Sequence, residues 1–118
     1  MKTVQQLYAE AKAVITEVPA RDVHERMARG EPTVLIDIRE QNEVNLGYPE
    51  GAILIGRGIL EREVESRVPR DAHVVLICAN GNRSALAARV LGEMGYADVS
   101  SLSGGFREWI EIGGAVAD

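Results

Sequence analysis

The sequence contains little of what several classes of protein require. Its 118 residues include a single cysteine, Cys78, so an intramolecular disulfide is excluded. The single cysteine also excludes zinc sites built from four cysteines, or from two cysteines and two histidines, within one chain. The longest apolar run, residues 74–79, is far shorter than the about 20 residues of a membrane-spanning helix. We therefore expect a protein with no metal site and no membrane partner.

The balance of charge limits the partners further. Thirteen basic and eighteen acidic residues give a net charge of −5. This excess of acid argues against binding nucleic acid or an anionic membrane through bulk charge, although a small local anion pocket remains compatible with it. The N-terminal residues have no apolar stretch typical of a signal peptide, so we expect a cytoplasmic location.

The pattern of apolar residues predicts one α/β domain. Apolar residues recur at helical spacing between Val4 and Ile15, and Thr3 and Gln6 have the spacing of a capping box. Two apolar runs rich in branched side chains, residues 33–38 and 73–78, are typical of central strands in a parallel sheet. Weaker strands are expected at residues 15–18, 52–55 and 98–102, and further helices near residues 19–30, 59–68, 83–94 and 106–112. This alternation predicts a central, mostly parallel β-sheet flanked by helices on both faces, with an extra N-terminal helix.

Helical spacing also predicts which side chains face the core. In the helix near residues 59–68, we expect this face to carry Ile59, Leu60, Val64 and Val68. In the helix of residues 83–94, the expected inner face consists of Leu86, Val90, Leu91 and Met94. In the last helix it consists of Phe106, Trp109, Ile110 and Ile112.

The segment after the second apolar run carries the strongest chemical signal. Cys78 ends the predicted strand and is followed by Ala79, Asn80, Gly81, Asn82, Arg83 and Ser84, where a helix begins. So short a connection must curl, and its N–H groups can then form an anion-binding nest beside the positive end of the helix. Arg83 adds a cation with a bidentate fork. This field favours the thiolate of Cys78, which makes Cys78 a candidate nucleophile rather than an ordinary buried cysteine.

Four segments in this order resemble single-domain rhodaneses. Residues 78–84 resemble the active-site loop of that family, and Asp37 and Arg39, followed by Glu43, resemble its Asp-x-Arg segment and downstream glutamate. Gly51-Ala52 and residues 102–106, with Trp109 and Gly113 beyond them, are similar to two further family segments. The resemblance begins near residue 18, so it predicts a rhodanese domain over residues 18–118 and a helical extension over residues 1–17.

The resemblance implies a sulfurtransferase that needs neither a metal nor an organic cofactor. In such enzymes a sulfane sulfur passes from thiosulfate, a persulfide or a polysulfide to an acceptor through a persulfide, here on Cys78. The acceptor would be a thiol such as thioredoxin or glutathione, or cyanide. Residues 79–84 would bind the sulfur-donor anion, and Asp37 and Arg39 would support the loop.

Two alternatives stay open beside this interpretation. The first is a binding or regulatory module that keeps the rhodanese fold with little catalysis. The second is a phosphatase or arsenate reductase, but the related phosphatases have a longer loop than the six residues from Cys78 to Arg83. Two departures from the family pattern also bear on function: Tyr48 replaces the usual histidine, and residues 79–82 are uncharged. Because Arg83 is then the only cation within the loop, we expect thiosulfate to be a poorer donor than a persulfide or polysulfide.

Overall fold

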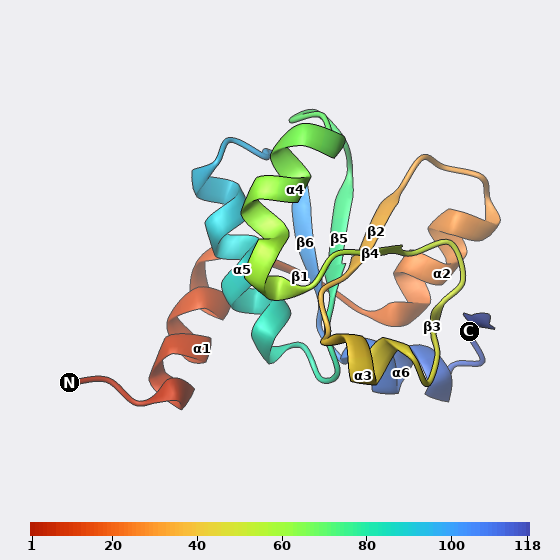
Figure 1. Ribbon diagram of the computed structural model, residues 1–118, viewed down its shortest axis with the longest axis horizontal. Coiled ribbons are helices and arrows are strands. Elements are labelled where there is room, and N and C mark those ends of the chain that lie inside the picture. The colour runs from red at the N-terminus through yellow and green to blue at the C-terminus, as the bar shows by residue number, and fades with distance from the viewer.

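The computed structural model describes residues 1–118 and has a central parallel sheet between two layers of helices (Figure 1). The strand order is β1-β6-β5-β2-β4, and all neighbouring strands of this five-stranded sheet are parallel. The strands of the sheet are β1 (Thr16–Val18), β2 (Val34–Asp37), β4 (Ile53–Leu54), β5 (Val74–Ile77) and β6 (Val99–Leu102). The predicted fold class is confirmed.

Helices cover both faces of the sheet. Their bounds are α1 (Val4–Val14), α2 (Ala20–Ala28), α3 (Gln41–Val44), the 3₁₀-helix η1 (Arg57–Ile59), α4 (Leu60–Arg67), α5 (Asn82–Glu93) and α6 (Gly105–Glu111). One apolar cluster joins α4 and α5 to the sheet, and a second joins α2 and α6 to its other face. No helix is long and apolar enough to span a bilayer.

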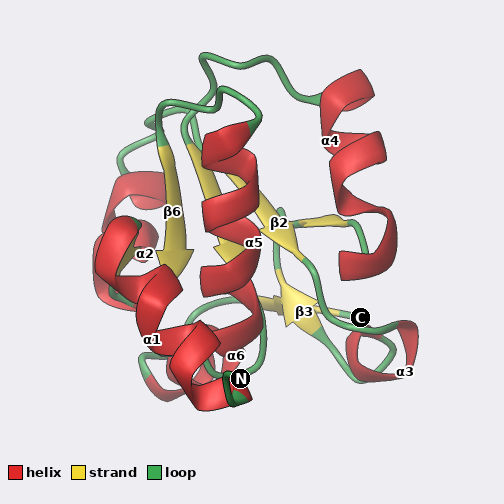
Figure 2. Ribbon diagram, turned by 90° about the vertical axis from the view of Figure 1, so that its left-hand side faces the viewer, coloured by secondary structure: helices red, strands yellow, loops and turns green.

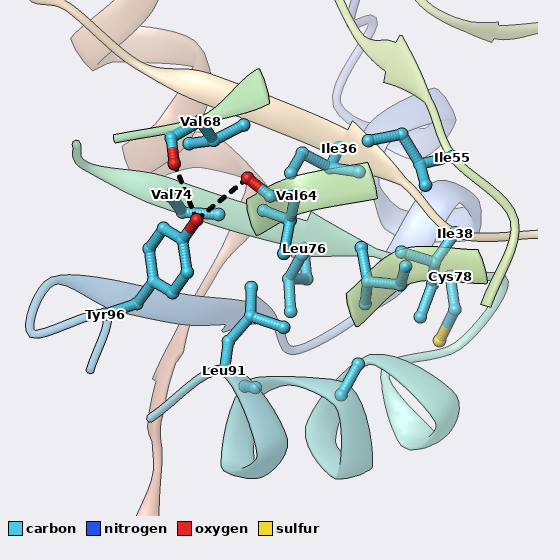
Figure 3. Close-up of a cluster of buried hydrophobic side chains, with 13 residues drawn as sticks. Ile36, Ile38, Ile55, Val64, Val68, Val74, Leu76, Cys78, Leu91 and Tyr96 are labelled. Atoms are coloured by element: carbon cyan, nitrogen blue, oxygen red, sulfur yellow. Dashed lines mark hydrogen bonds between the residues drawn. The ribbon is translucent and has the colours of Figure 1, made fainter. Parts of the chain in front are cut away.

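The central strand β5 divides its side chains between the two clusters, as the period of two in a strand requires. Val74 and Leu76 belong to the cluster under α4 and α5, and so does Cys78, the residue that follows the strand. Val75 and Ile77 belong to the opposite cluster. Figure 3 shows Cys78 at one end of the first cluster with its sulfur turned toward α5. The register of β5 therefore decides which helix the cysteine faces.

The N-terminal helix α1 packs against α5 on the outside of the fold (Figure 2). The predicted capping box is present, since Thr3 Oγ1 accepts from the Gln6 N–H and Gln6 Oε1 accepts from the Thr3 N–H. Ala11 is the fully buried residue of this helix, whereas Leu7 and Val14 on its apolar side are exposed. The part of α1 that is fully buried against the fold is thus a small side chain.

The predicted inner faces are right in part, since five of the named residues are buried: Leu60, Val64, Val68, Leu91 and Trp109. The buried side of α5 is formed by Ser84, Ala85, Ala87, Ala88 and Leu91, while Leu86, Val90 and Met94 are only half-buried. Small residues are needed there because α5 lies between the sheet and α1 and approaches both closely. Ile59, Ile110 and Ile112 are exposed, because the 3₁₀ turn and the short α6 rotate them away from the core.

A small second sheet was not predicted from the sequence. In it, β3 (Tyr48–Pro49) pairs antiparallel with β7 (Val116–Ala117), close to the C-terminus. Two-residue strands have no detectable period, so the pattern of apolar residues could not reveal this pairing. The departure from the family pattern at Tyr48 therefore falls in a short strand that holds the C-terminal segment.

Candidate active site

The loop after β5 surrounds the sulfur of Cys78 with backbone donors. The N–H of Gly81 lies 3.2 Å from Sγ and the N–H of Ser84 lies 3.3 Å from it. Cys78 is fully buried, so its sulfur lies beneath the loop rather than on the surface. The predicted nest is present in the structure, and the atom that these N–H groups contact is the sulfur itself.

A pair of buried hydroxyl groups continues from the sulfur into the core. The Cys78 thiol donates to Ser84 Oγ at 3.4 Å, and Ser84 Oγ lies 2.7 Å from Ser101 Oγ on β6. Hydroxyl groups can rotate to donate as well as accept. When the thiol loses its proton, the Ser84 hydroxyl can turn to donate to the thiolate, and Ser101 can donate to Ser84 in its place. Sequence reasoning included Ser84 but not Ser101, which is far away in the chain.

A glycine gives the loop its tight shape. Gly81 has a φ of +90°, a left-handed conformation that other residues rarely adopt. A Cβ at this position would overlap the backbone carbonyl of Ser103 in the turn after β6. The loop and that turn can therefore approach each other only because position 81 has no side chain.

The start of α6 holds the other side of the loop. The N–H of Phe106 donates to the carbonyl of Cys78 at 2.8 Å, and the N–H of Arg107 donates to the carbonyl of Ala79 at 3.3 Å. These N–H groups in the first turn of α6 thus find partners in the loop. This segment belongs to the family resemblance in the sequence, but its contact with Cys78 is visible only in the structure.

Asp37 and Arg39 form a buried ion pair that reaches the loop indirectly. Arg39 donates to both carboxylate oxygens of Asp37 at 2.9–3.1 Å and to the carbonyl of Gly47 at 2.7 Å. Its guanidinium lies 4.2 Å from the ring centroid of Phe106, the residue whose N–H contacts Cys78. The pair touches neither the sulfur nor residues 79–84, and its supporting role stays a prediction.

Arg83 is turned toward Glu43 on α3. Two parallel hydrogen bonds of 2.9 Å join its guanidinium to the two carboxylate oxygens. The Arg83 guanidinium lowers the pKa of Glu43 to about 2 despite partial burial, which acts in the opposite direction. The same hydrogen bonds raise the pKa of Arg83. The charge of Arg83 at the loop is therefore matched by the Glu43 carboxylate, a contact that the sequence alone did not predict.

A second cation reaches the loop from the N-terminal helix. Lys12, in the last turn of α1, donates from Nζ to Asn82 Oδ1 at 2.8 Å. Sequence reasoning missed this contact because 70 positions separate the two residues and nothing local marks it. The structure thus places Lys12 beside the loop of residues 78–84. Asp37 and Arg39 reach this loop only through Phe106.

Arg57 and the surface hollows lie away from the Cys78 loop. Arg57, the first residue of the 3₁₀-helix η1, pairs with Glu61 at 2.8 Å. The three surface hollows do not include Cys78, and the largest lies between the end of α1 and the far part of α5. No group of three His, Cys, Asp or Glu side chains is arranged to hold a metal ion.

Comparison of the chain with known proteins identifies its family. The model of the rhodanese-like domain matches residues 19–112, which is most of the chain. The chain belongs to this family. The matched residues contain the whole Cys78 loop together with Asp37, Arg39 and Glu43, whereas α1 lies outside them.

Relatives of this rhodanese-like chain have the names of sulfurtransferases. A thiosulfate sulfurtransferase of Shewanella oneidensis is 34% identical, and the match covers 73% of this chain and 84% of the relative. The solved structure of a polysulfide-sulfur transferase homodimer from Wolinella succinogenes has a TM-score of 0.82 at 27% identity, covering 97% of this chain and 86% of that one.

One structural neighbour bears a different description. A Rhodopseudomonas palustris protein, described as of unknown function and a possible tyrosine phosphatase, has a TM-score of 0.90 at 29% identity. The alignment covers 99% of this chain and 96% of the neighbour, so it includes α1. The N-terminal helix therefore recurs outside this chain, although the family model omits it.

Proposed function

We propose that this rhodanese-like protein is a sulfurtransferase that moves a sulfane sulfur through a persulfide on Cys78. The donor would be thiosulfate, a persulfide or a polysulfide. The acceptor would be a thiol, such as that of thioredoxin or glutathione, or cyanide. The observation that carries this proposal is the position of Sγ among the N–H groups of Gly81 and Ser84, at 3.2 and 3.3 Å.

The chemistry follows from that position. The Cys78 thiolate attacks the outer sulfur of thiosulfate, a bond forms between Sγ and that sulfur, and sulfite leaves with the electron pair of the broken S–S bond. The loop N–H groups stabilise negative charge on sulfur throughout the step. An acceptor such as cyanide then attacks the outer sulfur of the persulfide, which gives thiocyanate and restores the thiolate.

The loop supports sulfur transfer more than phosphate hydrolysis. A phosphatase must bind the oxygens of a phosphate above its nucleophile with several loop N–H groups. Here the loop has six residues from Cys78 to Arg83, and the N–H groups of Gly81 and Ser84 already contact Sγ. The guanidinium of Arg83, which would otherwise bind phosphate, is held by Glu43.

A reduced compartment suits this chemistry. Because the reaction requires Cys78 as a free thiolate, we infer a cytoplasmic location, where thiols are kept reduced. Thiol acceptors such as thioredoxin and glutathione are reduced in the same setting, which is consistent with their use as partners.

Parallel assays test the proposed function. We expect the purified protein to form thiocyanate from cyanide with thiosulfate or polysulfide as donor. We expect no release of phosphate from p-nitrophenyl phosphate. The Cys78→Ser variant should lose sulfur transfer while it keeps the fold, as judged by its thermal melt. Phosphate release that depends on Cys78, without any sulfur transfer, would overturn the proposal.

A further inference from the structure

Lys12 connects the N-terminal helix to the loop around Cys78. Its ammonium donates to Asn82 Oδ1 at 2.8 Å, and Asn82 is the first residue of α5. The neighbouring Ala11 is fully buried, so the last turns of α1 are held against the fold and Lys12 projects from a fixed base. The position of this ammonium thus follows from the packing of α1 on α5.

The charge of Lys12 is not matched by any carboxylate. Its only hydrogen-bond acceptor is the neutral amide oxygen of Asn82, and no Asp or Glu oxygen lies within 4.0 Å. The other cations around the site are paired: Arg83 with Glu43, Arg39 with Asp37, and Arg107 with Glu111. Lys12 is therefore the uncompensated cation in contact with the loop.

An ammonium in this state is suited to bind an anion. It carries three donors, of which Asn82 uses one, and its flexible stem lets the charge move by several ångströms. The loop residues 79–82 are themselves uncharged, so they do not compete with Lys12 for an incoming anion. Partial exposure screens the charge but does not remove it.

We propose that Lys12 binds the negatively charged group of reactants that approach Cys78, and so sets the preference for anionic sulfur donors. For thiosulfate, this group is the sulfonate end that leaves as sulfite. The identity of that donor rests on the proposed function, whereas the effect of Lys12 on anions at Cys78 does not. The charge that the loop lacks would thus be supplied by the helical extension of residues 1–17.

A pair of alkylating reagents tests this proposal without any sulfur transfer. Iodoacetate and iodoacetamide both react with a thiolate by displacement of iodide, and they differ in that only iodoacetate is an anion. Because Cys78 is the only cysteine, each reagent reports on that one sulfur. The quantity to measure is the ratio of the two rate constants, since a change in access to the sulfur affects both reagents equally.

In the Lys12→Met variant we expect the rate constant for iodoacetate, divided by that for iodoacetamide, to fall by about threefold to tenfold at low ionic strength. Methionine keeps most of the apolar stem and removes the charge. Lys12→Arg should restore the ratio. Lys2→Met is the matched control, because it removes a lysine of the same segment that pairs with Glu10 at 2.9 Å; its ratio should equal that of the wild type.

The Michaelis constant for thiosulfate provides a second measurement. We expect it to rise in Lys12→Met, with kcat changed far less, and to recover in Lys12→Arg. An unchanged alkylation ratio or an unchanged Michaelis constant in Lys12→Met would overturn the role of Lys12. A normal shift in the ratio in a protein that transfers no sulfur would instead overturn the proposed function and leave the anion-binding role in place.

Discussion

Glu43 and Arg83 face each other across the rim of the Cys78 loop, with both carboxylate oxygens bonded to the guanidinium at 2.9 Å. The pair joins α3 to the first turn of α5, and its two residues are 40 positions apart in the chain. The pair holds the end of the Cys78 loop against α3. The negative charge of Glu43 also cancels most of the positive charge of Arg83 at the rim of the loop. Removing either partner alone therefore changes the net charge at the rim.

We expect Arg83→Met to lower kcat/KM for thiosulfate by about tenfold or more, because it leaves the Glu43 carboxylate uncompensated beside the path of a dianion. The double variant Glu43→Gln/Arg83→Met removes both charges and should recover most of this loss. Arg29→Met is a control, since Arg29 belongs to an exposed pair with Glu31 at 3.0 Å just after α2, away from the loop. If the double variant is as impaired as Arg83→Met, the loss comes from the missing cation and not from the exposed carboxylate.

Stability should depend on the ionisation of Glu43. Its pKa is about 2 in the folded protein against a usual value of 4.5, so the folded state favours the charged form. The stabilisation is fully present above pH 4.5 and is lost as the pH falls toward 2. After allowance for solvent screening, we expect this contribution to be about 1 kcal/mol.

Denaturant unfolding between pH 6 and pH 3 measures this dependence, with Glu43→Gln as the comparison. The wild type should lose more stability over this range than the variant, which has no carboxyl group to protonate at position 43. Equal losses in the two proteins would show that the Glu43–Arg83 pair contributes nothing to stability.

The left-handed backbone at Gly81 should tolerate no side chain. We expect Gly81→Ala to cost several kcal/mol of stability and most of the activity, because the new Cβ meets the backbone carbonyl of Ser103. Gly30→Ala is the matched control: Gly30 has a φ of +75° and open space around it. That variant should lose only about 1 kcal/mol, the cost of the backbone conformation alone. Thermal melts of both proteins compare the two costs, and similar values would contradict the close approach of the loop to Ser103.

Arg39 should be hard to replace, even by lysine. The Arg39 guanidinium donates to Asp37 and to the carbonyl of Gly47 while its plane lies over the Phe106 ring. The ammonium of a lysine cannot make all three contacts at once. We expect Arg39→Met to lower the free energy of unfolding by about 3 kcal/mol or more, since the buried Asp37 loses its partner. Arg39→Lys should restore less than half of that loss. Full restoration by lysine would mean that only the charge of Arg39 matters.

The elements that the sequence predicted well are those with a strong local pattern. The apolar runs of residues 33–38 and 73–78 contain the strands β2 and β5, and the capping box at Thr3 marks the start of α1. The position of Cys78 at the end of its strand followed from the same run. A parallel sheet places such strand ends at one edge, so the approximate location of the loop could be predicted as well.

What could not be predicted depends on contacts between distant segments. The partner of Arg83 lies on α3, a helix of four residues that is too short to show a period. The contact of Lys12 with Asn82 arises only when α1 packs on α5. Helical spacing favours the large residues Leu86, Val90 and Met94 for the inner face of α5, whereas close packing between sheet and helix selects small residues there.

The central claim, a persulfide on Cys78, is tested most directly by the intact mass of the protein after incubation with thiosulfate and, separately, with polysulfide. We expect a gain of one sulfur atom with at least one donor, its removal by a reductant or by cyanide, and no gain in Cys78→Ser. Absence of the adduct with both donors, or wild-type sulfur transfer by Cys78→Ser, would contradict it.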